Sequence, residues 1–226
     1  MRNLLKKVVF YMVLGGCLVL GVEPSMAQTF SLGIVNINAI DAETLQPHNG
    51  TIAMGSEQRS GQGIIIDPAG IIATNKHIIG NAPQHIYVKL LGGRTFEAKI
   101  IQNSQADLTL LKINAPFPLP AITLGDSSQI QIGNRVLAFA NAGLNPQQEQ
   151  NGEVIQLYRE VPSDTVAILE VNIRLKPGDS GGPILNEQGL LLGLIMANQI
   201  SDATKSYAIA SNKIRREYWK FKQNMP

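Results

Sequence analysis

The chain has 226 residues, of which 44% are hydrophobic and 16% are charged, with a formal net charge of +2. This composition excludes an intrinsically disordered protein, and the length allows one domain with a sizeable core or two small barrels that share an interface. Because Arg2, Lys6 and Lys7 precede the first apolar run, the rest of the chain is close to neutral, and we expect no nucleic-acid partner.

The N-terminal segment has the pattern of a secretory signal. Three basic residues are followed by an apolar run over residues 8–22 and by small residues up to Ala27. We therefore expect a signal peptide over residues 1–27, cleavage near Ala27, and export to a bacterial periplasm or the cell exterior. Two alternatives stay open: a retained leader, which is the only route we expect to membrane association, and a lipid anchor at Cys17.

Cys17 is the only cysteine, so a mature chain that begins after Ala27 has no disulfide. The three histidines, His48, His77 and His85, do not have the spacing of metal ligands. We therefore expect neither a metal nor a cofactor.

Short β-branched or apolar runs, broken by Gly, Pro, Asn and Asp, follow one another along the rest of the chain. Their regular spacing predicts an all-β fold built of barrels, and the proline-rich segment 116–120 is where one barrel could pass into the next. The runs span residues 63–66, 70–74, 86–91, 96–101, 108–113, 135–140, 152–158, 166–171, 182–185 and 190–196.

Among the histidines, His77 has the setting that catalysis requires. It closes a predicted strand that begins at residue 70, so a rigid element would hold its imidazole at a strand-to-loop junction. His48 lies in a polar stretch typical of a loop, and His85 begins a strand, where an edge or solvent-facing position is expected.

Asp107 is the acid most suited to orient a histidine, because it heads the apolar run 108–113. A lone carboxylate there would be costly to bury, and a hydrogen bond from the Nδ1–H of His77 would provide a partner and fix the tautomer. Asp67 and Asp126 lie in turn-like sequences, where turn or capping roles are expected.

Residues 178–183, Gly-Asp-Ser-Gly-Gly-Pro, place the hydroxyl of Ser180 in a glycine-rich tight turn. The N–H groups of Gly178 and Ser180 can point together at the oxygen that becomes negative when a carbonyl is attacked. With His77 as base and Asp107 as orienting acid, the turn predicts nucleophilic catalysis. Taken alone, the hexapeptide could also be an ordinary turn between strands.

Two further segments are distinctive. Residues 141–152 are polar and predict a long loop, which is either solvated or able to gate a neighbouring site. Residues 212–223 have apolar side chains at helical spacing and five basic residues, which predicts an amphipathic helix that closes the second barrel. A basic helix lying on a membrane surface is the alternative.

Three motifs resemble, in order and spacing, those of the HtrA (Deg) bacterial proteases, a branch of the chymotrypsin/trypsin-like serine proteases. The resemblance covers about residues 50–216. It implies two six-stranded antiparallel β-barrels and a C-terminal helix, with the catalytic groups in the cleft between the barrels. The three motifs are 74–79, 106–111 and 178–183, and two further segments, 60–67 and 207–212, also match. The implied divisions are about 28–116 for the first barrel, about 117–211 for the second and 212–223 for the helix.

The chain departs from that family in two ways. The segment after Ser180 is used in finishing the second barrel, so we expect none of the PDZ modules with which HtrA proteases usually end. Asp179 stands where many HtrA enzymes have asparagine, and in trypsin this aspartate pairs with a new N-terminal amine. Zymogen-type activation with Ile34 as the new N-terminus is therefore a hypothesis, although no basic residue precedes such a cut.

The resemblance implies a secreted serine endopeptidase that acts on proteins or peptides, in quality control or processing. In this fold the segments around Leu175 and Met196 wall the pocket for the side chain just before the cut, which predicts a preference for apolar residues there. The alternative is a catalytically silent homologue that binds unfolded or partner proteins through the same cleft.

Overall fold

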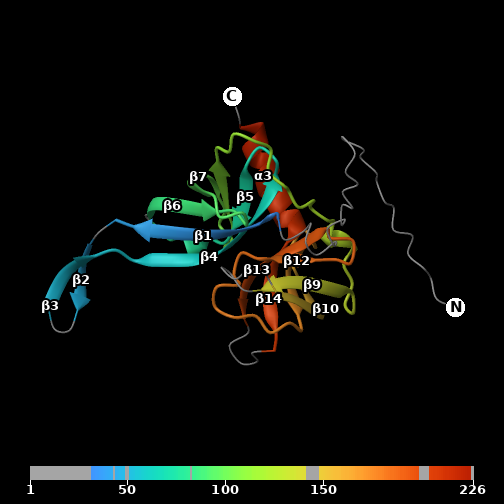
Figure 1. Ribbon diagram of the computed structural model, residues 1–226. Helices are drawn as coiled ribbons and strands as arrows, with labels where there is room; N and C mark the ends of the chain where they lie inside the picture. Colours follow the sequence, from blue (N-terminus) through green and yellow to red (C-terminus); the bar gives the residue numbers. More distant parts are fainter. Residues whose placement is uncertain are drawn as a thin grey trace, which may run out of the picture.

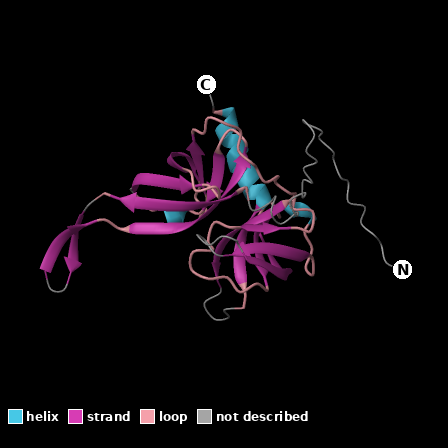
Figure 2. Ribbon diagram, viewed as in Figure 1, coloured by secondary structure: helices cyan, strands magenta, loops and turns pink. Residues whose placement is uncertain are grey.

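The computed structural model describes residues 32–42, 44–48, 51–81, 83–140, 148–198 and 204–224. Nearly all of its regular structure is β-strand, arranged in two closed barrels with one long helix, α3 (Ser211–Gln223), near the C-terminus (Figure 2). The predicted double barrel with a C-terminal helix is confirmed. The predicted leader and Cys17 lie outside the described residues, and no helix within those residues is long and apolar enough to cross a membrane.

Barrel one is closed by antiparallel strands in the spatial order β1–β4–β5–β8–β7–β6. The middle of strand β4, residues 61–65, is buried: Ile65 packs in the core of this barrel, while Ile64 packs in the interface with the second barrel. The strands are β1 (Ile34–Asp41), β4 (Gln58–Asp67), β5 (Ile71–Thr74), β6 (Pro83–Lys89), β7 (Thr95–Asn103) and β8 (Thr109–Ile113).

Barrel two has the order β10–β11–β14–β13–β12–β9. The predicted loop over 141–152 is wrong at its C-terminal end, because β10 already begins at Gln148; residues 141–147 are not described. The strands are β9 (Arg135–Ala140), β10 (Gln148–Arg159), β11 (Val166–Val171), β12 (Pro183–Leu185), β13 (Leu191–Asn198) and β14 (Ser206–Ala210).

A third apolar cluster joins the two barrels. Ile64 and Leu108 from barrel one pack in the same cluster as Leu185 and Leu194 from barrel two, together with Ile214 of α3. Burying a leucine or isoleucine side chain contributes about 1.5–3 kcal/mol. The barrels are therefore held together by an interface as apolar as their own cores.

A two-stranded hairpin of β2 (Thr44–His48) and β3 (Thr51–Gly55) extends away from barrel one (Figure 1). The predicted loop around His48 is therefore wrong, since His48 is the last residue of β2. The Asn-Gly dipeptide that follows it in the sequence is typical of two-residue hairpin connections, and is the signal that the loop interpretation missed.

Helix α3 packs against both barrels, and not only against the second as predicted. Gln102 of β7 donates a hydrogen bond to Glu217 at 3.1 Å, and the Tyr218 hydroxyl donates one to Asp67. The basic side chains of the helix all have partners within the protein, which leaves the membrane-surface alternative without support. Lys213 and Arg216 pair with Glu160, Lys220 with Glu217 and Lys222 with Asp67, while Arg215 donates to the carbonyls of Leu124 and Gly125.

Candidate active site

The turn that carries Ser180 is closed by hydrogen bonds of its own. The Lys176 N–H donates to the Asp179 carboxylate at 2.7 Å, and the Asp179 N–H donates back to the Lys176 carbonyl at 3.0 Å. The Gly182 N–H donates to the Asp179 carbonyl, also at 3.0 Å. Because Asp179 is buried and has a partner in its own turn, the structure gives no support to its pairing with an Ile34 amine; Ile34 lies in β1, opposite Ile64.

The backbone of this turn leaves two donors for a ligand. Gly178 has φ of +96°, a conformation that favours glycine. Within the described part of the chain, neither the Gly178 N–H nor the Ser180 N–H donates a hydrogen bond. These are the two groups that the sequence assigned to an oxyanion site.

His77 lies just after β5, in a single helical turn, α2 (Lys76–Ile79). The prediction that His77 closes the strand is wrong, because β5 ends at Thr74. The turn is anchored by Ile78 and Ile79, which are both buried in the core of barrel one, while the side chain of His77 is half exposed. Burial of its neighbours thus fixes the backbone under the imidazole.

Asp107 holds His77 at two points. One carboxylate oxygen accepts from the His77 backbone N–H at 2.9 Å, and the other lies 2.7 Å from the ring Nδ1. Pairing of Thr74 with Thr109 in the neighbouring strands β5 and β8 brings the two segments together. Since Nδ1 faces a carboxylate, it carries the proton in the neutral ring, and Nε2 is then the basic nitrogen.

The Ser180 hydroxyl is directed at the Met196 carbonyl and not at His77. It donates to the carbonyl of Met196 at 3.4 Å, and within the described residues no hydrogen bond joins it to His77. An O–H···O hydrogen bond is usually 2.5–3.0 Å long, so this one is weak. A side-chain rotation that breaks it therefore has a low cost.

The two halves of the site face each other across strand β4. A Cβ atom added to Gly61 would lie 2.4 Å from Cδ1 of Ile78 and 3.0 Å from the carbonyl oxygen of Ser180. The residue after His77 and the turn that carries Ser180 thus border the same glycine. The N–H of Gln62 donates to the Ser180 carbonyl at 2.7 Å and fastens the turn there.

The two residues predicted to wall the substrate pocket have different surroundings. Leu175 is only 3% exposed and packs in the core of barrel two. Met196 is half-buried, packs against the cluster between the barrels, and supplies the carbonyl that accepts the Ser180 hydroxyl. The apolar pocket stays a prediction.

The residues set aside in the sequence have the expected structural roles. Asp67 accepts from the Ala69 N–H in a turn, and Asp126 accepts from the Ser128 N–H at the start of a short 3-10 helix, η1 (Ser127–Gln129). His85 is on the solvent face of β6 and lies 3.0 Å from Glu97. Among the described residues there is no cluster of three or more His, Cys, Asp or Glu side chains that could hold a metal ion.

A pocket of about 630 Å³ opens beside His77 and Asp107. Arg59 also lines this pocket and pairs with Asp41 at 2.5 Å. The hydrogen bond to Asp41 has a larger effect than burial and, with that to Glu57, raises the pKa of the guanidinium above its ordinary value. The pocket is therefore lined by a cation that is paired with Asp41 and Glu57.

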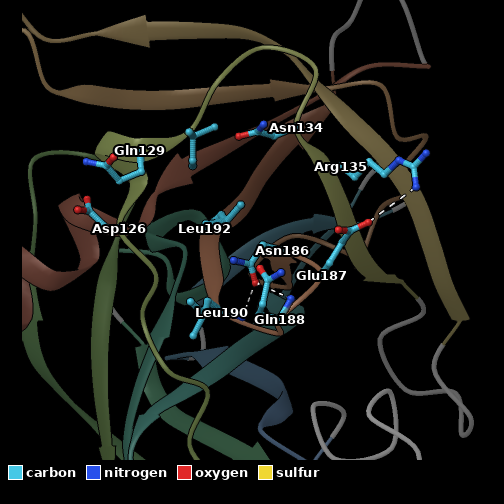
Figure 3. A pocket seen from close by; sticks show the side chains of 10 residues that line it. Asp126, Gln129, Asn134, Arg135, Asn186, Glu187, Gln188, Leu190 and Leu192 are labelled. Carbon is cyan, nitrogen blue, oxygen red and sulfur yellow. Dashed lines mark hydrogen bonds and ion pairs between the residues drawn. The ribbon is translucent and has the colours of Figure 1, made fainter. Parts of the chain in front are cut away.

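A second pocket, of about 430 Å³, lies on barrel two and includes none of the candidate catalytic residues (Figure 3). Its polar side chains are used in local structure: Asn186 accepts from the N–H groups of Gln188 and Leu190, and Arg135 pairs with Glu187 at 3.8 Å. We do not assign it to the reaction.

Comparison with known proteins identifies the family and the fold. Residues 61–194 match the model of the trypsin-like peptidase domain. The chain belongs to this family of trypsin-like peptidases. The solved HtrA-type protease AlgW, with a decapeptide, has the same fold, with a TM-score of 0.75 and 21% identity over 86% of this chain and 64% of that one.

Two curated relatives have a higher sequence identity to this chain than that solved structure has. A probable periplasmic DegP-like serine endoprotease of Pseudomonas savastanoi pv. phaseolicola is 35% identical over 61% of this chain, and the serine protease HTRA1B of Danio rerio is 30% identical over 70%. The matches cover only 29% and 34% of those relatives. The chain thus spans about a third of the length of the curated relatives it matches.

Proposed function

We propose that this peptidase-family chain is an active serine endopeptidase, with Ser180 as nucleophile, His77 as general base and Asp107 as the residue that orients His77. The observation that carries the proposal is the double contact of Asp107, which accepts from both the backbone and the ring of His77. That contact directs the basic nitrogen of the imidazole away from the carboxylate.

The reaction has two stages. In the first, Nε2 of His77 takes the proton of the Ser180 hydroxyl as its oxygen attacks the peptide carbonyl, and the imidazolium then gives that proton to the departing amine. In the second, water gives a proton to His77 as it attacks the ester, and the proton returns to Ser180 as the acid leaves. Asp107 stabilises the imidazolium in both stages.

The negative oxygen of each tetrahedral intermediate would be bound by the N–H groups of Gly178 and Ser180. Gly178 has the positive φ that such a turn requires, and neither N–H has an acceptor within the described residues. Loss of one such donor costs about 100-fold or more in turnover.

We propose cleavage after apolar residues, with Leu175 and Met196 near the substrate side chain. Arg174, an exposed residue, stands in the segment where trypsin has its base-binding aspartate. A peptide-library profile dominated by cleavage after Lys or Arg would contradict this specificity.

The substrates we propose are unfolded or processed proteins outside the cytoplasm. Two observations support export: the basic and apolar leader with Ala27 at its end, and relatives whose names include the word periplasmic. N-terminal sequencing of the exported protein is expected to begin after Ala27.

The second candidate function is a silent homologue that binds partner proteins. The observation in its favour is the Ser180 hydroxyl, which donates to Met196 and not to His77. At 3.4 Å that bond is weak, so rotating the Ser180 side chain away from Met196 has a low cost.

A fluorophosphonate probe separates the two functions, because it reacts only with an activated serine. We expect it to label the wild-type chain and to leave the Ser180→Ala variant unlabelled. A folded wild-type chain that takes no label would favour the silent homologue.

A further inference from the structure

The backbone of Gln62 links the two halves of the candidate site. Its N–H donates to the carbonyl of Ser180 at 2.7 Å, and its carbonyl accepts from the Thr74 hydroxyl, also at 2.7 Å. Thr74 and Gln62 are fully buried, and Thr74 lies three residues before His77. We propose that these two hydrogen bonds form a strap, Thr74–Gln62–Ser180, and that Thr74 is a positioning residue for the reaction.

The strap lies just beyond the point where the backbone pairing of β4 with β5 ends. The last paired residues of β4 and β5 toward the site are Ile64 and Ala73. Beyond that pair, the Thr74 side chain makes the connection that a backbone ladder would otherwise make. The hydroxyl thus fixes the spacing between β4 and the segment that leads into His77.

The turn that carries Ser180 also packs directly against the Gln62 carbonyl. Gly181 has φ of +82°, and a Cβ atom added to it would lie 1.9 Å from the carbonyl oxygen of Gln62. The same Cβ would lie 3.1 Å from Oγ1 of Thr74, so the turn and the Thr74 hydroxyl meet at one carbonyl oxygen, that of Gln62. A shift of Gln62 toward β5 would carry Ser180 with it and change its position relative to His77.

Thr109 provides a matched control, because it is the register partner of Thr74 in the next strand. It is equally buried, and its hydroxyl donates to Asn103 at 2.8 Å. That bond lies within barrel one and has no connection to the nucleophile turn. Thr109→Val therefore removes the same kind of buried hydroxyl and leaves the strap intact.

The inference rests on the proposed function, because the position of Ser180 matters to the rate only if Ser180 reacts with the help of His77. The test compares Thr74→Val, Thr74→Ser and Thr109→Val in the full chain, at a temperature where all are folded. We expect Thr74→Val to lower kcat and the rate of fluorophosphonate labelling by roughly 10-fold or more, with KM changed less than about twofold. Thr74→Ser retains the hydroxyl, so we expect the wild-type rate, and we expect the same rate for Thr109→Val.

Two results would overturn the strap: a folded Thr74→Val that reacts at the wild-type rate, or a Thr109→Val that is slowed as much as Thr74→Val. If Thr74→Val does not fold, Thr74→Ala takes its place, because it removes the hydroxyl without adding volume. Its kcat and labelling rate are then compared with those of Thr109→Val. Amide hydrogen exchange of residues 178–182 gives a readout without activity, since we expect it to rise in Thr74→Val but not in Thr109→Val. A wild type that takes no label would refute the proposed function, and exchange would still test the strap.

Discussion

The two halves of the candidate site are built differently. The His77–Asp107 pair lies within barrel one, where the pairing of β5 with β8 brings its members to 2.7 Å. Ser180 lies on barrel two, and its position depends on a contact with Gln62 across the interface. The difference teaches that neighbouring strands are enough to assemble the proposed acid and base, whereas the proposed nucleophile needs correct packing of one barrel on the other.

The largest effect is expected from breaking the half within barrel one. Asp107→Asn keeps the shape of the side chain but presents the wrong donor to the imidazole, so we expect kcat to fall on the order of 10⁴-fold. The matched control is Glu97→Gln, because Glu97 lies 3.0 Å from the His85 ring on the solvent face of the same barrel. Kinetics on a peptide substrate check both, and an equal loss in Glu97→Gln would contradict the assignment.

A smaller but still large loss of kcat is expected when the turn that carries Ser180 is pushed away from Gln62 of barrel one. In Gly181→Ala the new Cβ would overlap the Gln62 carbonyl at 1.9 Å, so the turn must move, and we expect at least about a 100-fold loss of kcat.

Gly93→Ala controls for the backbone conformation. Gly93 has φ of +84°, close to that of Gly181, but nothing lies within 4 Å of the added Cβ. It should cost about 1–2 kcal/mol of unfolding free energy and no activity. If both variants lost activity equally, the overlap with Gln62 would not be the cause.

The smallest effect concerns the attachment of α3, which supports the interface but not the chemistry. Hydrogen bonds from Asn212 and then from Ser128 lower the pKa of Asp126 from 3.8 to about 2. A carboxylate with a lowered pKa stabilises the fold above its unfolded pKa, and this stability is lost as the pH falls through about 2. We therefore expect the difference in unfolding free energy between wild type and Asp126→Asn to be largest above pH 4 and to decline toward pH 2.

Urea unfolding between pH 2 and 6 checks this pH dependence. Glu187→Gln serves as the control, because Glu187 and Arg135 are both exposed and 3.8 Å apart, a contact worth little. A pH dependence in Asp126→Asn equal to that of the wild type would contradict the assignment.

The sequence was sufficient for the fold where strands are mostly apolar. The run 135–140 coincides with β9 and the run 166–171 with β11, because such strands are buried on both faces. Strand β1 lies outside the predicted runs, since Asn36 and Asn38 alternate with its buried residues and break the apolar run. The alternation itself, with a period of two, was the signal to follow.

The candidate site likewise has a part that the sequence could predict and a part that it could not. His77, Asp107 and Ser180 could be selected because their side chains have the chemistry that a peptidase needs. The contacts of Gln62 could not, because they use backbone N–H and carbonyl groups that almost every residue has. Residue type gives no indication of a backbone contact between positions as distant in sequence as Gln62 and Ser180.

The most direct test of the account asks whether groups from the two barrels act as one unit. A double-mutant cycle with His77→Ala, Ser180→Ala and the double variant measures this in the hydrolysis of a peptide with an apolar residue before the cut. We predict that each single variant loses nearly as much kcat as the double variant, because neither group works without the other. Losses that multiply independently, or a His77→Ala variant with wild-type kcat, would contradict it.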